Sequence, residues 1–442
     1  MQLQNPVQIL SKKLIKPATP TPHHLHKFKI SSLDQFNPPL YVSYIFCYPA
    51  IDKDHAKAKI LERNTQLQRS LSQVLALYYP LAGRYVKENL LIHCNDLGVE
   101  YIEAKVSGRL SPLVQADADS CWQLKHFIPV QFESPSSPLL AVQCNMFECG
   151  GVAIALSISH RIVDGFVFSK FIDSWATTSR AGIDKVCHHP NFKLASVLPT
   201  MEMVPEIMCL PPFNPQLKIA SKTFVFKNLE ASRPKEVLKR QPSQVQMVTA
   251  VIWKALMKVS QVRNGKLRPS VIIHMLNLRR GRTALPISDD YCGNLIRPAI
   301  IRFTPDKESR VELRNMVSLL SNEINFAVNE CAKPQTSDDL FYMVYNAWKN
   351  AVEVFSRGEA DAYCVTSLCG MPSYPDFGWE KPVRVIHTQS LVEMILLQDT
   401  RDGDGIEALI YLDENVMSLF EQDPDIIAFT SQNRSKHLLS GL

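Results

Sequence analysis

A proline-rich segment near the middle of the chain is the feature that most limits how this sequence can fold. Residues 181–221 hold six prolines and show little hydrophobic periodicity. Proline removes a backbone donor and breaks helices, and so long a stretch without regular structure is uncommon inside a compact domain. The segment therefore predicts a crossover between two structural units. We place the crossover at residues 186–221, after a unit at residues 1–185 and before a unit at residues 222–442.

Strand-like and helix-like segments alternate on both sides of this crossover. Runs rich in β-branched and aromatic residues predict strands, and apolar residues at helical spacing predict helices. The runs at 138–147 and 151–159, joined by a glycine-containing turn, predict a β-hairpin. The alternation predicts an α/β fold in which each half mixes strands with helices. The other predicted strands lie at 41–48, 222–226, 271–278, 383–387, 393–399 and 407–412, and helices are predicted around 67–75, 167–175, 244–259 and 313–327.

Composition excludes several classes of protein. The 442 residues are 46% hydrophobic and 21% charged, which rules out a wholly disordered chain, and a net charge of +5 is too small to indicate a nucleic-acid binder. No signal peptide and no apolar run near the roughly 20 residues of a membrane span are visible, so we expect a cytoplasmic protein without a membrane partner. The 11 cysteines include no Cys-x-x-Cys pair, and we interpret the cluster at 187–189 as a polar loop rather than a metal site.

One short motif carries candidate chemistry. His160 follows an apolar strand, and Asp164 and Gly165 precede a predicted helix. Histidine is the side chain best suited to take a proton near neutral pH, and Asp164 could cap the helix or hold the histidine in place. Spacing alone leaves a structural histidine as the alternative. A serine hydrolase is disfavoured because no Gly-x-Ser-x-Gly elbow occurs.

The motif SHRIVDG at 159–165 resembles the His-x-x-x-Asp-Gly motif of the plant BAHD acyltransferases, which move an acyl group from a coenzyme A thioester to an alcohol or amine. Other signatures of this family follow in the same order along the chain, and within the family the sequence is most similar to the branch of alkaloid acetyltransferases. These signatures are LIKP with TPTP near 14–22, LDQ at 33–35, YYPLAGR at 78–84, HCNDLGV at 93–99, FECGG at 147–151, NLR at 277–279, GN at 293–294, DFGW at 376–379 and DT with GDGIE at 399–407.

The resemblance implies a fold of two chloramphenicol-acetyltransferase-like domains, each a mixed β-sheet flanked by helices, joined by a long crossover loop, with a channel between them. It also implies that residues at about 372–395 join the first domain. His160 would be the general base, and Asp164 would pair with an arginine, for which Arg279 is the candidate. Gly165 would allow a tight turn beside the base, while Asp376 and Gly378 would belong to a structural loop away from the chemistry. Candidate coenzyme A contacts at the channel mouth are Ser243, Lys254 and Lys258.

The function implied by the resemblance is acetyl transfer from acetyl-CoA to a hydroxyl of an alkaloid or another plant specialised metabolite. Both substrates would meet in one ternary complex, with no permanently bound cofactor and no metal, in a monomer. The alternatives are a catalytically degenerate relative that only binds a ligand and a relative that uses another acyl donor or reaction. The sequence departs from the family where Glu380 replaces the last glycine of the DFGW loop. If that position requires a positive φ, a glutamate there is strained.

Overall fold

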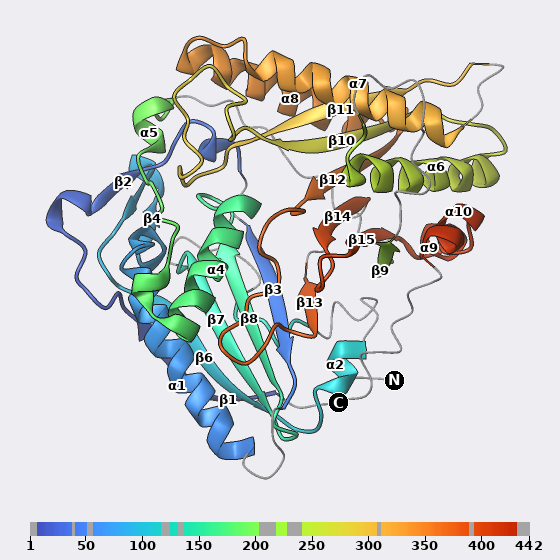
Figure 1. Cartoon of the computed structure of the whole chain (residues 1–442). Coiled ribbons are helices and arrows are strands. Elements are labelled where there is room, and N and C mark those ends of the chain that lie inside the picture. Colours follow the sequence, from blue (N-terminus) through green and yellow to red (C-terminus); the bar gives the residue numbers. More distant parts are fainter. Residues whose placement is uncertain are drawn as a thin grey trace.

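A computed structural model of the chain describes residues 7–37, 40–50, 56–115, 124–130, 137–202, 218–227, 241–306, 311–388 and 393–430 (Figure 1). Two mixed six-stranded sheets and one small three-stranded sheet form its framework. The first sheet has the strand order β1 (Val7–Ile15), β6 (Val99–Val106), β7 (Leu140–Phe147), β8 (Val152–Ser159), β3 (Tyr41–Tyr48) and β13 (Arg384–His387). The second has the order β11 (Ile296–Phe303), β10 (Ser270–Asn277), β12 (Asp361–Ser367), β14 (Met394–Asp399), β15 (Gly405–Asp413) and β9 (Ile219–Lys227). The small sheet pairs β2 (Lys27–Lys29), β5 (Leu91–His93) and β4 (Arg84–Val86).

Helices cover the sheets, as expected for an α/β fold. The first sheet carries α1 (Ala56–Leu75) and α4 (Gly165–Ala181) on one face and the short α2 (Ser111–Gln115) on the other (Figure 1). The second sheet packs against α6 (Gln244–Asn264) and α7 (Leu313–Cys331) on one face and against α8 (Ser337–Arg357) on the other. The other α-helices in the described ranges are α5 (Leu194–Val197), α9 (Glu414–Phe420) and α10 (Pro424–Thr430). No helix within the described ranges is long and apolar enough to cross a bilayer.

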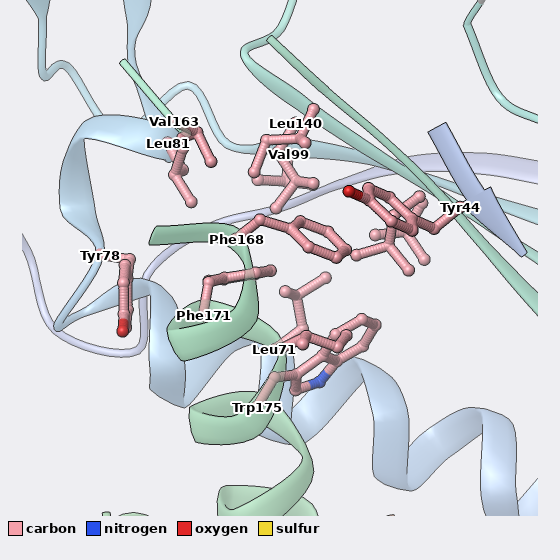
Figure 2. Packing of buried hydrophobic residues seen from close by; sticks show 14 of the residues in the cluster. Tyr44, Leu71, Tyr78, Leu81, Val99, Leu140, Val163, Phe168, Phe171 and Trp175 are labelled. Atoms are coloured by element: carbon pink, nitrogen blue, oxygen red, sulfur yellow. The ribbon is translucent and has the colours of Figure 1, made fainter. Parts of the chain in front are cut away.

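The strand β8 ends directly before His160 and determines where this residue lies. All eight residues of β8 are buried, because α1 and α4 cover one face of this central strand and α2 covers the other. A mostly apolar strand, here interrupted only by Ser157 and Ser159, is the pattern expected for a position buried on both faces. In the core beneath α4, the Phe168 ring stacks on Tyr44, with ring centroids 3.9 Å apart (Figure 2). The Trp175 indole N–H donates to the Ser70 hydroxyl at 3.0 Å, so α4 is anchored to both β3 and α1.

The same apolar core continues into the second sheet. Leu396 of β14 and Leu409 of β15 belong to the cluster that contains Leu156 of β8. The two sheets therefore share a packed interface beside α4, and β13 comes from late in the chain to pair with β3. The predicted fold class is confirmed, whereas the predicted domain limits stay a prediction. The region expected to lack regular structure holds a 3₁₀ turn at Ile183–Lys185 and the helix α5, and residues 203–217 of it lie outside the described residues.

Candidate active site

His160 is the first residue after β8, where the strand leaves the sheet. Its backbone N–H donates to the Leu40 carbonyl at 2.9 Å, and its own carbonyl accepts from Asn294 Nδ2 at 2.8 Å. The side chain is half-buried, and its Nδ1 atom is buried with no hydrogen-bond partner in the part of the chain that the structure describes. The backbone N–H and carbonyl of His160 are therefore both held, while no described side chain forms a hydrogen bond with Nδ1 of the ring.

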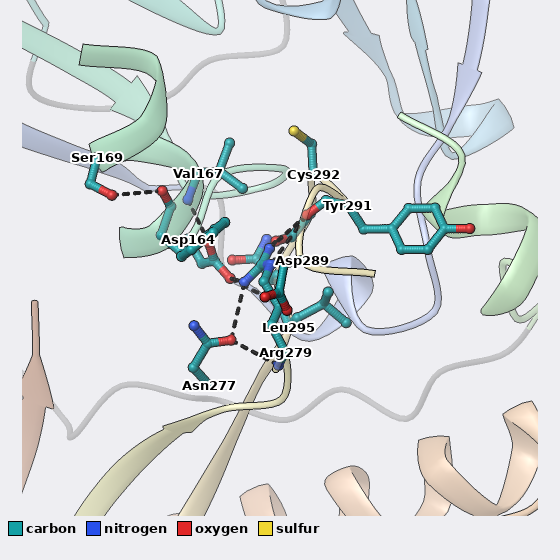
Figure 3. A network of polar contacts seen from close by, with 12 residues as sticks. Asp164, Val167, Ser169, Asn277, Arg279, Asp289, Tyr291, Cys292 and Leu295 are labelled. Carbon is teal, nitrogen blue, oxygen red and sulfur yellow. Dashed lines mark hydrogen bonds and ion pairs between the residues drawn. The ribbon is translucent and has the colours of Figure 1, made fainter. Parts of the chain in front are cut away.

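Asp164 is engaged in structural contacts rather than in a contact with His160. One carboxylate oxygen, Oδ1, accepts from the Val167 backbone N–H at 2.9 Å and caps the N-terminus of α4. The other, Oδ2, accepts from Arg279 Nη1 at 2.7 Å and from the Leu295 backbone N–H at 3.1 Å (Figure 3). The ion pair with Arg279 that the resemblance implied is present. Both side chains are almost fully buried, so the pair joins α4 to the end of β10 inside the protein.

Arg279 uses all of its donors at this position. Besides Asp164, Nη1 contacts Asn277 Oδ1 at 3.4 Å, and Nε and Nη2 donate to the Tyr291 carbonyl at 3.2 and 2.9 Å. Nη2 also donates to the Gly293 carbonyl at 2.9 Å. A guanidinium has five N–H groups, and these contacts account for all five (Figure 3). Because a buried charge is costly unless it is paired and hydrogen-bonded, this network compensates a side chain with no exposed surface.

A second network, to which the sequence assigned no role, supports the backbone of His160. Asn294 Nδ2 bridges the carbonyls of His160 and Arg161 at 2.8 and 3.1 Å, and also donates to Asp34 Oδ1 at 2.9 Å. The carboxylate of Asp34 accepts in turn from the backbone of Asn294 at 2.7 Å and from the Ser31 hydroxyl at 2.7 Å. Burial raises the pKa of Asp34, and these hydrogen bonds act in the opposite direction. The segment around Asp34 is thus connected to the backbone of the His160 motif by the Asn294 side chain.

Two glycines allow the close approaches around this site. A Cβ atom on Gly165 would lie 2.5 Å from Leu368 Cδ2, so the first turn of α4 packs directly against the segment after β12. Gly293 has a φ of 143°, and a Cβ there would lie 2.5 Å from Leu194 Cδ2. Non-bonded heavy atoms do not approach so closely. In addition, the positive φ of Gly293 is a backbone conformation that only glycine adopts readily. A larger residue at either position would force the terminal methyl of the facing leucine to move, and at Gly293 it would also strain the backbone.

The DFGW loop lies at the opposite end of α4. Asp376 Oδ1 accepts from the Gly378 and Trp379 backbone N–H groups at 2.8 and 3.1 Å, and Asp376 pairs with Arg180 near the C-terminal end of α4. Arg180 follows Asp164 by 16 residues, which corresponds to about 24 Å along a helix. This position fits the structural role that the resemblance implied for Asp376 and Gly378, and it separates the loop from His160.

Glu380 occupies a strained backbone conformation that its replacement by glycine should relieve. Its φ is 78°, the left-handed region that a residue with a Cβ adopts at a cost. We expect Glu380→Gly to increase the free energy of unfolding by about 1 kcal/mol, since glycine removes the strain but loses some backbone entropy. Urea denaturation measures the change. The control is Glu380→Ala, which deletes the carboxylate but keeps the Cβ; if alanine stabilises equally, the glutamate side chain and not its backbone is responsible.

The three candidate coenzyme A contacts have partners within the protein. Ser243 caps α6, and its hydroxyl accepts from the Gln246 backbone N–H at 3.2 Å. Lys254 and Lys258 both pair with Asp425 of α10, at 2.9 and 2.6 Å. Helix capping is therefore a sufficient structural role for Ser243, and ion pairing is one for Lys254 and Lys258. The binding of coenzyme A by these three residues stays a prediction.

Comparisons with known proteins place nearly the whole chain in one family. The model of the Transferase family matches residues 5–427. The chain is 33% identical to acetyl-CoA-benzylalcohol acetyltransferase of Clarkia breweri, over 96% of this chain and all of the relative. It is 35% identical to stemmadenine O-acetyltransferase of Catharanthus roseus, over 94% and 96% of the two chains. The crystal structure of vinorine synthase superposes with a TM-score of 0.78 at 29% identity, over 96% and 98% of the two chains. The chain therefore belongs to the Transferase family, the BAHD acyltransferases, and is an acyltransferase that uses an acyl-CoA co-substrate.

Proposed function

We propose that this enzyme transfers an acetyl group from acetyl-CoA to a hydroxyl group of an alkaloid or a small aromatic alcohol, with His160 as the general base. The observation that carries the proposal is the environment of His160. Its backbone is held on both sides, while its ring has no carboxylate partner among the described residues and its Nδ1 atom is buried. Nε2 is then the ring nitrogen that an acceptor hydroxyl can reach. The names of two relatives support acetyl-CoA as the donor and benzyl alcohol or an alkaloid alcohol as acceptors to test.

In this mechanism, Nε2 takes the proton from the acceptor hydroxyl while its oxygen attacks the thioester carbonyl. The C–O bond forms, a tetrahedral intermediate collapses, and the C–S bond breaks. The proton then passes from the imidazolium to the leaving thiolate, which gives an ester and free coenzyme A. The attack is direct and needs no covalent acyl-enzyme, because both substrates bind together. General-base catalysis of this kind contributes about 10²- to 10⁴-fold in rate.

The experiment that tests this function incubates the purified full-length protein with acetyl-CoA and each acceptor in turn. Benzyl alcohol and an indole alkaloid alcohol are the first acceptors, and malonyl-CoA is the comparison donor. Release of free thiol and a product heavier by one acyl group, detected by mass spectrometry, are the two readouts. Release of thiol without an acylated product would indicate hydrolysis and contradict transfer to the acceptor. A malonylated product at a higher rate than the acetylated one would overturn the proposed donor.

The presence of glutamate at position 380 does not indicate that this protein is a non-catalytic member of the family. Its loop is tied to the C-terminal end of α4 through Arg180, whereas Asp164 and His160 lie at the N-terminal end. The strain at Glu380 is thus separated from the candidate base by nearly the length of a helix. We therefore expect it to affect stability more than the rate of transfer.

Asn294 should act as a positioning residue for His160. We expect Asn294→Ala to lower kcat by about tenfold or more with little change in KM, because loss of both carbonyl contacts lets the base shift by a fraction of an ångström. The matched control is Asn145→Ala, which removes another buried amide that donates to the Phe127 and Ala153 carbonyls. Asn145 pairs with Ala153, seven residues before His160 along β8, or about 23 Å away. Both variants should be destabilised; equal kcat values would refute the positioning role.

A further inference from the structure

Two arginines place positive charge in the second sheet and beside it: Arg297 of β11 and Arg282 of the loop after β10. Arg297 of β11 donates from Nη1 to the Ala327 carbonyl at 2.7 Å and to Cys331 Sγ at 3.3 Å, both in the last turns of α7. Its Nε atom is buried and has no hydrogen-bond partner among the described residues. Arg282, in the loop after β10, is half-buried and donates from Nη1 to the Asn277 carbonyl at 2.7 Å.

Neither guanidinium has an acidic partner among the described residues. Over the ranges that the structure describes, Arg279 pairs with Asp164, but no carboxylate pairs with Arg282 or Arg297. Burial lowers the pKa of Arg282, and the charge of Arg280 lowers it further; Cys331 acts in the opposite direction. Partly buried charges are costly when they are unpaired. These two arginines therefore hold excess positive charge that an anion would compensate.

His274 lies beside these two arginines. In the register of β10 and β11, Leu276 pairs with Arg297 and His274 pairs with Ala299, so the three side chains of His274, Leu276 and Arg297 share one face of the sheet. His274 is 7% exposed, and its Nδ1 atom is buried without a hydrogen-bond partner in the described structure. Burial lowers its pKa to about 4, and Arg282 adds to this shift. A buried imidazole nitrogen without a hydrogen-bond partner, next to two guanidiniums that have no acidic partner among the described residues, is typical of a polar site without its ligand.

We propose that Arg282, Arg297 and His274 form a binding site for an oxyanion, such as a phosphate or carboxylate group. Guanidinium groups bind these anions through charge-assisted hydrogen bonds, and the imidazole can add one more contact. Two sources supply the same chemistry: a phosphate of the acyl-CoA co-substrate, or an acidic group on the acceptor. Asn277 connects the site to the active centre, because its carbonyl accepts from Arg282 while its Oδ1 accepts from the Arg279 backbone N–H at 3.0 Å.

Calorimetric titration with inorganic phosphate tests the site without requiring turnover, so its result does not depend on the proposed acetyl transfer. We expect phosphate to bind wild type, and Arg282→Gln to weaken binding by about tenfold or more, the size of a charge-assisted hydrogen bond. The matched control is Arg302→Gln, an exposed arginine further along β11 whose Nη2 donates to Asn350 Oδ1. It should bind phosphate like wild type. Binding that is equal in all three proteins would mean an adventitious ion only and would overturn the site.

A spectroscopic measurement on the wild-type protein tests the site even if the Arg282→Gln variant does not fold. Phosphate bound beside His274 should raise the pKa of this imidazole, because a nearby negative charge favours the protonated form. Its NMR resonance, assigned with His274→Asn, should therefore titrate at a higher pH when phosphate is present. An unchanged titration would contradict the proposal.

Kinetic competition then identifies the source of the anion. Inhibition by phosphate that is competitive with acetyl-CoA would assign the site to a phosphate of the donor, and 3′-dephospho-CoA compared with coenzyme A would show which phosphate. Competition with the acceptor would assign it to an acidic acceptor group. In either case, Arg282→Gln should remove the inhibition while Arg302→Gln should retain it. Inhibition that persists unchanged in Arg282→Gln would place the ion elsewhere and overturn the proposal.

Discussion

His160→Ala is expected to lower kcat by about 10²- to 10⁴-fold, the range that a positioned general base contributes. This corresponds to about 3–5 kcal/mol of activation free energy. The loss should fall on kcat rather than on KM, because the proton moves in the transition state and not on binding. Stability should change little, since the half-buried ring donates or accepts no hydrogen bond in the described structure. The backbone contacts of His160 with Leu40 and Asn294 remain available to alanine.

The matched control for this variant is His189→Ala, an exposed histidine in the segment after α4. It should keep the kcat of wild type. Initial rates of ester formation from acetyl-CoA, together with urea denaturation of each protein, separate loss of chemistry from loss of folding. If His160→Ala keeps more than about a tenth of the wild-type kcat, His160 is not the base. If its stability falls by several kcal/mol, the rate loss cannot be assigned to chemistry.

Local patterns were sufficient for much of the fold. The aromatic and β-branched run at 41–48 predicts β3 with its observed limits, and the hairpin predicted around the glycine turn is the antiparallel pair of β7 and β8. The pairing of β13 with β3 could not be predicted from hydrophobic periodicity, because it joins residues 384–387 to residues 44–47. The edge strand β1 was missed because most of its residues are exposed, which leaves no alternating apolar pattern.

Some residues of the candidate site could likewise be predicted from the sequence, and others could not. His160 and Asp164 are four residues apart, so a local motif identifies them, and the family resemblance supplied Arg279. The network of Asp34 and Asn294 joins residues 260 positions apart, and no spacing rule connects them. Asp34 lies in the LDQ signature and Asn294 in the GN signature, but neither signature indicates that the two side chains meet, because the Asp–Asn contact forms only when folding brings the segments together. The unpaired charges of Arg282 and Arg297 likewise become informative only when burial and the absence of a described acid partner are known.

Asp164→Ala is expected to lower the free energy of unfolding by about 3–5 kcal/mol. Removing this carboxylate leaves Arg279 charged, unexposed and without its anionic partner, which is the costly way to break a buried ion pair. The substitution also removes the cap of α4 at Val167, a contact of the kind that contributes about 1 kcal/mol, and leaves the Leu295 N–H without its acceptor. These contributions are not additive because they share one side chain. Total stabilities of about 5–15 kcal/mol make so large a loss severe.

Two further variants separate the parts of this effect. Asp164→Asn removes the charge and keeps only one side-chain oxygen, which can accept from Val167 or from Arg279 but not from both. Because one of the two acceptor roles is kept, it should cost less than alanine. Glu353→Ala breaks the exposed pair between Glu353 and Arg357 and should cost less than about 1 kcal/mol. Urea denaturation of the three variants gives the comparison. A loss below about 1 kcal/mol for Asp164→Ala would mean that Arg279 is not held by this pair. A large loss for alanine, a smaller one for asparagine and almost none for Glu353→Ala would show that Asp164 acts by holding α4 against the end of β10, which keeps the strand end at His160 in place.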